Sequence, residues 1–471
     1  MNMFGRRMIV TDETVVTRDN VLDIFDRAMW VHRQNASEIE YLWNYYKGDQ
    51  PILNRTKKVR ADICNRIVEN RANEIVSFKV GYLCGEPIQY IGKSSDEGVS
   101  AGISRLNAMM ESLDKDALDR ELVKWMVIAG VAYRFVYPRT VEDGCPPFKL
   151  FTPDPRTTFV VYGADVEHVP MLGVTYYTDA NGVIHATAWS NTTRWDIEDG
   201  KITSEKWHLM GDVPIIEYPA DDARLGAFEI VISLLDANND LISNRMDGID
   251  QFVQAFLKFV NAEIDEETLM KFIELGAIMV RSPPGVQADV DLVAQELDQS
   301  QTQVTKDDIY SSILTICGMP NRNGGTSTSD TGQAVIFRDG WSAAESRAKD
   351  SENSYRRPER RMLSIILRIC RAVEGAPDEV ATLRLDDIAL KFTRRNYEAI
   401  QSKAQVLVEM LGCDKIHPKL AFEASGLFID PERAYAQSME YYEAERDRQS
   451  NVNGGDADDD KEKDGQERPK S

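Results

Sequence analysis

The chain has 471 residues, enough for two to four domains, and its 77 acidic against 55 basic side chains give a formal net charge of −22. Such an acidic chain is unlike a protein that wraps nucleic acid, because tight binding needs basic groups that displace counterions from phosphates. The charge does not exclude DNA that slides past an acidic surface without adhering.

The sequence lacks the signals that are typical of several other classes of protein. No run of about 18 apolar residues occurs, so no membrane-spanning helix is expected, and the first 16 residues lack the apolar core of a signal peptide. The six cysteines are scattered without CxxC spacing, and the five histidines show no HxxxH or HExxH pairing. The sequence therefore predicts a reduced, cytosolic-type chain with no disulfide framework, no metal and no cofactor.

The first 130 residues are mainly helical by pattern. We expect two helices within residues 18–47, with Ser37 as the N-cap of the second, and a helix from Asn65 to Val80 that Gly81 ends. A strand is expected at 86–91 and helices at 99–113 and 115–129.

Between Val131 and Tyr218 the pattern changes to short strands separated by Asp-Gly and Asn-Gly turns. This spacing indicates a half-exposed antiparallel sheet and not a βαβ array. The expected strands are 131–138, 148–153, 157–163, 171–178, 183–190, 192–197 and 213–219.

The stretch from Ala227 to Val260 has the apolar spacing of one long helix, without proline. Four aspartates fall together on its other side, namely Asp236, Asp240, Asp247 and Asp250. An acidic front on an apolar helix is either a solvated outer face or the wall of a channel, and this segment alone favours the solvated face.

The remaining chain alternates helices with a loop and ends in a charged tail. Residues 261–303 form a small acidic module, 304–317 a helix, and 321–332 a glycine-rich polar loop. A helix from Gln333 to Val373 is expected to kink at Pro358. A strand at 385–392, helices at 397–411, 418–424 and 431–448, and a disordered tail follow.

Signatures of catalysis are weak or absent. The sequence GGTSTSDTG lacks the lysine of a phosphate-binding loop, and no GxSxG elbow occurs. Acidic pairs such as Asp307-Asp308 are expected by chance in so acidic a chain, although they leave a metal-dependent nuclease open. Four arginines form a basic string that either grips phosphates or, as we favour, pairs with acidic faces of neighbouring helices or subunits: Arg356, Arg357, Arg360 and Arg361.

Three segments together carry a family resemblance: NRIVENRANEIVSFKVGYLCGEPIQY, FTPDPRTTFVVYG and RLGAFEIVISLLDANNDLISNRMDGIDQFVQAFLKF. In this order they resemble the portal proteins of tailed bacteriophages with long non-contractile tails, over most of residues 40–400. The resemblance implies an α+β, mainly helical portal-type fold with long stem helices, an antiparallel β-containing wing, a clip module and a helical crown.

The resemblance also implies a domain order. The wing would be 1–226 with 376–400, the stem helices 227–260 and 304–318, the clip 261–303, the tunnel loop 319–332, the kinked helix 333–375, the crown 401–448, and the disordered acidic tail 449–471.

The implied function is non-enzymatic. About twelve copies would form a ring at one vertex of the virion capsid, assembled in the host cytoplasm, through which double-stranded DNA passes without sequence specificity. Its partners would be the terminase large subunit, a head-completion adaptor, the scaffold and the major capsid protein. The rival interpretations are the metal-dependent nuclease and a protein-only capsid scaffold or adaptor.

Three groups of site residues follow from the resemblance. The four aspartates would line the channel, and the four arginines would lie at subunit interfaces. The loop residues that touch DNA would be Asn321, Arg322, Asn323, Gly324, Gly325, Thr326, Ser327, Thr328 and Ser329, among which Arg322 is the only charge.

Overall fold

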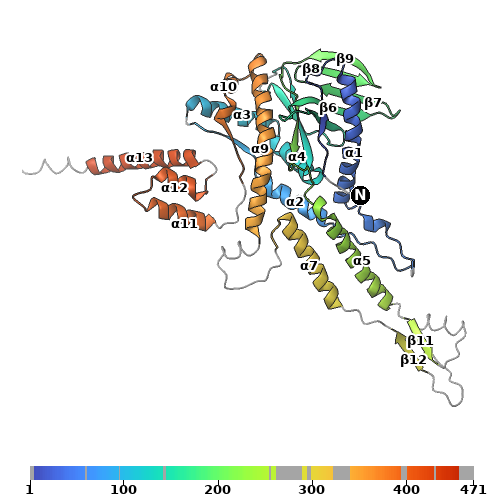
Figure 1. The fold of residues 1–471 in the computed structure, drawn as a ribbon. Coiled ribbons are helices and arrows are strands. Elements are labelled where there is room, and N and C mark those ends of the chain that lie inside the picture. Colours follow the sequence, from blue (N-terminus) through green and yellow to red (C-terminus); the bar gives the residue numbers. More distant parts are fainter. Residues whose placement is uncertain are drawn as a thin grey trace, which may run out of the picture. The chain divides into compact units, whose positions relative to one another are not determined.

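The computed structural model describes residues 5–58, 61–94, 96–141, 145–253, 256–260, 289–293, 299–321, 340–393, 400–428 and 431–455. The chain divides into two compact units (Figure 1). The first comprises Met1–Gly325 and Phe337–Phe392, and the second comprises Thr326–Ile336 and Thr393–Ser471. Both helices and strands build the first unit, as the α+β prediction requires.

A six-stranded sheet forms the outer part of the first unit. Its order is β1 (Ile9–Thr11), β5 (Thr158–Gly163), β6 (Pro170–Thr178), β7 (Ile184–Trp189), β8 (Thr193–Glu198) and β9 (Lys201–Trp207). All neighbours are antiparallel except β1, which runs parallel to β5. The sequence pattern missed β1 and β9, because one is very short and the other, KITSEKW, has few apolar residues.

Two layers cover this sheet. Helix α1 (Val21–Lys47) shares an apolar core with one face. On the other face lies a three-stranded sheet of β10 (Ile215–Pro219), β3 (Val131–Pro138) and β4 (Phe148–Phe151). The two sheets approach so closely that a Cβ at Gly173 would lie 2.8 Å from the Cβ of Ile215. Glycine is therefore required at this position.

The expectation of two helices within residues 18–47 is wrong, since α1 is continuous. No glycine or proline interrupts the chain between Asn35 and Ser37. The Asn35 side chain accepts a hydrogen bond from the Arg7 backbone N–H at 3.0 Å and donates one to the Arg7 carbonyl at 2.9 Å. These contacts fasten α1 to the N-terminal segment, and Ser37 lies inside the helix as an ordinary residue.

A second core joins this β region to four helices: α2 (Arg71–Leu83), α3 (Glu97–Ser112), α4 (Lys115–Ala129) and α9 (Trp341–Ala372). Strand β13 (Ile388–Lys391) follows the 3₁₀ turn η3 (Leu385–Asp387) and pairs with β2 (Gln89–Gly92), while α10 (Asp378–Ala381) packs on α3. Helix α9 is continuous through Pro358 and begins at Trp341, later than the expected Gln333. Residues 333–339 lie outside the described residues.

Two helices extend from this body, α5 (Ile232–Val253) after the 3₁₀ turn η2 (Glu229–Val231), and α7 (Gln299–Cys317), and they pack against each other (Figure 1). The predicted helix 227–260 is wrong at both ends. Phe256–Val260 is strand β11, antiparallel to β12 (Asp289–Val293). Aromatic and β-branched residues favour a strand where such pairing is offered.

The described residues of the second unit form three helices, α11 (Ile400–Leu411), α12 (Pro418–Ser425) and α13 (Pro431–Gly455). The Phe422 ring lies 5.1 Å from Phe428 and 5.7 Å from Tyr435, which joins α12 to α13. Because α13 continues to Gly455, the range 449–471 is not disordered throughout as expected. Glutamate, arginine and glutamine in residues 443–449 are good helix formers. Residues 456–471 lie outside the described residues.

Candidate functional site

A segment with little regular structure runs along α5 and covers one of its faces. We call residues 50–58 and 61–70 the strap. It contains a single 3₁₀ turn, η1 (Pro51–Asn54), and leads into α2. The predicted helix from Asn65 is therefore wrong: α2 begins at Arg71, where the side chain of Asn70 accepts a hydrogen bond from the Asn73 N–H. The strap instead uses its backbone to bind α5.

The strap and α5 are joined by polar groups. The backbone N–H of Ile67 donates to Ser243 Oγ at 3.0 Å, and that of Glu69 donates to Asn239 Oδ1 at 2.9 Å. Asn238 in turn donates to the Glu69 carboxylate at 2.8 Å. Asn238, Asn239 and Ser243 are all buried. These side chains satisfy backbone groups that an irregular segment cannot pair within itself.

Asp247 is the most strongly held member of this contact. Its carboxylate accepts hydrogen bonds from the Asn65 N–H at 2.6 Å and from Arg55 Nη1 at 3.1 Å, and it forms an ion pair with Lys57. Burial raises the pKa of Asp247, but the hydrogen bonds from Lys57 and Asn65 outweigh burial and leave the pKa below its usual value.

The other three aspartates differ from one another. Asp236 accepts a hydrogen bond from the Tyr45 hydroxyl at 2.8 Å. Burial raises the pKa of the Asp236 carboxyl, although this hydrogen bond makes the rise smaller. Asp250 accepts a hydrogen bond from Asn65 Nδ2 at 2.7 Å. Asp240 alone among the four is exposed.

The prediction of one open acidic face on α5 therefore needs correction. The four aspartates do share a side of the helix, but Tyr45 and the strap cover most of that side. Conversely, Met246 and Ile249, which belong to the apolar spacing of this helix, are 40% and 41% exposed. Periodicity identifies the two faces of a helix, but it does not say which face a polar segment elsewhere in the chain will cover.

Helices α5 and α7 are attached to the body by a third apolar core. Phe228 and Val231 just before α5 and Leu235 in its first turn pack with Ile313, Leu314 and Cys317 at the end of α7, and with residues of α1 and α2. Both helices are thus fixed to the body at one end, because their buried apolar residues concentrate there.

The chain leaves this core at Pro320 and returns to it at Gly340. A Cβ at Gly340 would lie 3.7 Å from Pro320 Cα and 3.8 Å from the Met319 carbonyl oxygen, so the two points are adjacent. Trp341 then packs on Phe78 and Tyr82 of α2, with ring centroids 6.2 and 6.1 Å apart. The two ends of the intervening segment are therefore close together and held by the body.

Only Asn321 of the predicted loop residues is described. It is half-buried, and its Nδ2 donates to Ser311 Oγ of α7 at 3.5 Å. The other predicted loop residues lie outside the described residues, and they are Arg322, Asn323, Gly324, Gly325, Thr326, Ser327, Thr328 and Ser329.

The basic string on α9 is engaged largely within the chain. Arg361 pairs with Asp212 at 2.5 Å, Arg360 with Asp386 at 2.9 Å, and Arg356 with Glu352 at 3.3 Å. Arg357 is exposed. These contacts agree with ion pairing to neighbouring elements, and a role between subunits stays a prediction.

A buried ionic cluster holds α9 to α4 and the β region, and the sequence did not reveal it. Lys115 pairs with Asp119 at 2.5 Å and with Glu359 at 2.9 Å, and Arg134 pairs with Asp119 at 2.6 Å. Three tyrosine hydroxyls complete it: Tyr90 and Tyr218 donate to Glu359 at 2.6 Å, and Tyr355 donates to Asp119 at 3.0 Å. Burial raises the pKa of all three tyrosines. The i,i+4 spacing of Lys115 and Asp119 was the one signal in the sequence.

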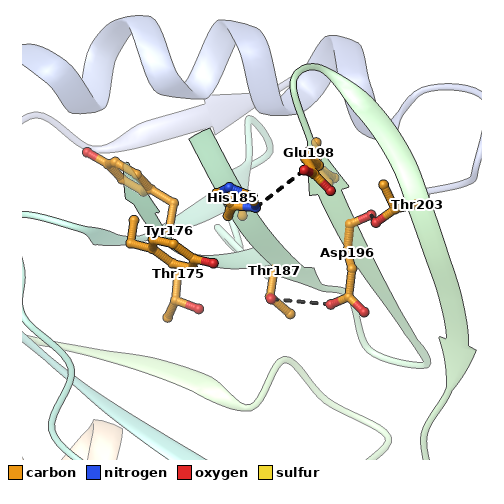
Figure 2. A pocket seen from close by; sticks show the side chains of 10 residues that line it. Thr175, Tyr176, His185, Thr187, Asp196, Glu198 and Thr203 are labelled. Atoms are coloured by element: carbon orange, nitrogen blue, oxygen red, sulfur yellow. Dashed lines mark hydrogen bonds and ion pairs between the residues drawn. The ribbon is translucent and has the colours of Figure 1, made fainter. Parts of the chain in front are cut away.

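A pocket of about 320 Å³ is lined by residues of β6, β7, β8 and β9 (Figure 2). His185 stacks on Tyr177 with ring centroids 4.8 Å apart and lies 3.9 Å from Glu198. Asp196 accepts hydrogen bonds from Thr187 at 3.3 Å and from Arg194 at 2.8 Å. These groups mainly satisfy one another, and in the described part of the chain no three histidine, cysteine or acidic side chains gather as metal ligands.

Within the described residues, no helix combines the length and apolar character that crossing a lipid bilayer requires.

Comparisons with known proteins place these features in context. A family model described as phage portal protein, SPP1 Gp6-like, matches residues 30–452. A solved structure titled "Neck of empty GTA particle computed with C6 symmetry" is similar over 76% of this chain and 90% of its own, with 14% identity and a TM-score of 0.45. No curated protein sequence gives a significant match.

Proposed function

Because the chain belongs to the SPP1 Gp6-like family of phage portal proteins, we propose that its copies form the ring through which double-stranded DNA is packaged into the capsid and later ejected. As a portal protein it is a ring-forming structural component of the head-to-tail connection, at a vertex of the virion capsid. The family is not enzymatic, so the nuclease alternative is set aside. The protein-only scaffold or adaptor alternative is set aside because the family is one of portal proteins.

The observation that carries the proposal is the exposed apolar surface of the stem. Met246 and Ile249 on α5 are 40% and 41% exposed, and Ile316 and Val304 on α7 are 42% and 60% exposed. The polar face of α5 already contacts the strap, so this apolar surface is the part that remains to be covered. In a ring each copy meets the next through unlike surfaces, which provides such cover.

The domain roles are part of the proposal. The wing is assigned to 1–226 with 376–400. The pairing of β13 with β2 supports the inclusion of 376–400. The stem is assigned to 227–260 and 304–318, with its first helix restricted to α5, and the clip to 261–303. The tunnel loop is assigned to 319–332, the long helix to 333–375, the crown to 401–448, and the tail to 449–471. The separate unit that begins at Thr393 supports the crown assignment.

The channel wall is proposed to repel DNA and to touch it only through the tunnel loop. Repulsion from carboxylates keeps a polyanion from adhering, with screening over about 8–10 Å at ordinary salt. Asp240 suits this role best among the four aspartates, because its carboxylate is exposed. The residues from Asn321 to Ser329 are small and polar, with Arg322 as the one group that attracts phosphate.

The partners are likewise proposed from the family. The clip would dock the terminase large subunit during packaging and a head-completion adaptor afterwards. The scaffold and the major capsid protein would meet the ring during assembly in the host cytoplasm, and twelve is the expected number of copies.

The first experiment tests assembly. We expect electron microscopy of the purified full-length protein to show rings with an axial opening. The double variant Met246→Asp, Ile249→Asp should stay monomeric by analytical ultracentrifugation with an unchanged circular dichroism spectrum. Val166→Asp, at a residue that is 97% exposed, is the matched control and should assemble normally. Rings formed equally by the double variant would remove the observation on which the proposal depends.

The second experiment tests DNA passage. Deletion of residues 321–332 should leave rings intact, because the base at Pro320 and Gly340 is anchored independently, but it should abolish DNA packaging in a motor-driven assay. Normal packaging by deleted rings would contradict the tunnel-loop assignment while leaving ring formation untouched.

A further inference from the structure

A second cavity, of about 340 Å³, lies where strands β8 and β9 meet the end of α9. Its walls include the rings of Tyr137, Trp189 and Trp207, together with Ile369 and Val373 of the α9 region. This volume is at the lower end for ligand sites and holds one large side chain. Trp207 is 68% exposed, so a bulky apolar group faces solvent at the cavity mouth.

One polar group inside the wall has no partner. Trp189 is 4% exposed, and its buried indole Nε1 has no hydrogen-bond partner. A buried donor without an acceptor costs free energy. The neighbouring His208 is already satisfied, since its ring contacts the Ser190 carbonyl at 3.1 Å and the Met210 N–H at 3.4 Å.

The rim of the cavity carries two cations although the whole chain is strongly acidic. The Arg194 guanidinium lies 5.1 Å above the Trp189 ring and already pairs with Asp196 at 2.8 Å, whereas Lys206 is an exposed lining residue. Lining residues include no carboxylate. An occupant with a negative charge next to its apolar group therefore complements this rim.

Strand β9 supplies a backbone edge beside the cavity. It is the outermost strand of its sheet, and no described strand pairs with its free side. Lys206 and Trp207 stand at its end, so an added strand would arrive at the cavity mouth. Exposed edges of this kind bind extended peptides through main-chain hydrogen bonds, and adjacent pockets select side chains.

We propose that this cavity docks an extended segment of a partner protein, which adds alongside β9, inserts one bulky apolar side chain between Trp189 and Trp207, and places a carboxylate against Lys206. The occupant is a protein segment because the site combines a backbone edge with a cavity for one side chain. A nucleic acid would meet only two cations here, on a chain whose net charge of −22 repels it.

The binding test uses assembled full-length protein and a fluorescein-labelled peptide in which threonine and glutamate alternate around one central phenylalanine. We expect saturable binding by fluorescence anisotropy. Replacement of the phenylalanine by alanine should weaken binding about tenfold or more, as for other buried aromatic anchors. Equal binding of the two peptides, or none by either, would overturn the proposal.

Variants of the protein locate the site. Trp207→Ser should weaken the peptide about tenfold or more, whereas Trp30→Ser, at a tryptophan with the same 68% exposure on α1, should not. Ala372→Trp fills the cavity from the helix side and leaves its aromatic lining residues in place. It should weaken peptide binding to a similar extent as Trp207→Ser. Lys206→Glu should weaken binding several-fold, with Lys149→Glu on β4 as its control.

Two results would reassign the surface. Binding to unassembled subunits but not to rings would mean that a second copy already covers the cavity. Displacement of the peptide by an oligonucleotide would mean that the rim recognises phosphate. Either result contradicts a partner-protein site.

Discussion

Charged side chains fasten helices to the body in two regions, and the two regions differ in their access to water. The ionic cluster of Lys115, Asp119, Arg134 and Glu359 is enclosed, with side-chain exposures between 0% and 4%. In the strap contact the acceptor Asp247 is 5% exposed, but its partners Arg55 and Lys57 are 15% and 27% exposed.

The enclosed cluster is therefore a fixed joint, whose loss affects the whole core, and the strap contact is a local joint. Removing one member of the enclosed cluster leaves a desolvated charge that water cannot reach, so the whole core must respond. Removing one member of the strap contact leaves cations that can turn toward solvent. We therefore expect α4, the β region and α9 to unfold as one body, and the strap to open from α5 separately.

The largest expected effect comes from Glu359→Gln. Neutralising Glu359 leaves Lys115 and Arg134 with Asp119 as their remaining carboxylate, and breaking a buried charge network costs about 3–5 kcal/mol. Urea denaturation measures the free energy of unfolding. Glu374→Gln, the same change at an exposed residue just after α9, should stay within about 0.5 kcal/mol. A loss below about 1 kcal/mol for Glu359→Gln would show that the cluster is not the fixed joint.

A smaller and more local effect is expected from Asp247→Asn. Hydrogen bonds to charged groups contribute about 1.5–3 kcal/mol, and the asparagine oxygen still accepts from the Asn65 N–H. Amide hydrogen exchange at Asn65, Ile67 and Glu69 should accelerate about tenfold or more, while the core of α9 stays protected. Asp240→Asn, on the same side of the helix, is the control. Equal acceleration throughout the protein would mean that strap and body open together.

The pH dependence of this second effect has a definite sign. The pKa of Asp247 is lower in the folded protein than its ordinary value of 3.8, so the charged carboxylate stabilises the fold above that value. This contribution is lost as the pH falls through the lowered pKa. The difference in unfolding free energy between the wild type and Asp247→Asn should therefore shrink below about pH 3.8. A difference that grows at lower pH would contradict the assignment.

The smallest effect is expected from Arg360→Ala. Arg360 and its partner Asp386 are 37% and 88% exposed, and solvent-exposed pairs contribute about 0–1 kcal/mol. The melting temperature should change little. A loss as large as that of Asp247→Asn would remove the distinction between enclosed and open ion pairs.

Local patterns predicted some regular elements closely. Helix α4 and strand β3 begin and end where periodicity and turn residues place them. The edge strand β9 escaped detection because KITSEKW has no apolar alternation to mark a buried face. The end of the strap, residues 65–70, was predicted as helix because Ile67 and Val68 continue the apolar period of α2.

The site was less accessible to prediction, because its contacts join distant segments. The four aspartates were correctly grouped on one side of α5, yet only the fold brings Tyr45, Arg55 and Asn65 onto that side. Similarly, Glu359 carries no mark in the sequence that distinguishes it from the many other acidic residues. Long-range pairing of polar groups has no periodic signature.

Because Pro320 and Gly340 are adjacent, the length of the chain between them does not affect where the surrounding helices lie. Since both attachment points are held by α2 and α7, residues can be added or removed between them without moving either helix. Each doubling of a flexible loop costs only about 0.6 kcal/mol in closure entropy. A foreign insert of different length should therefore be accepted in this segment while the surrounding architecture folds as before.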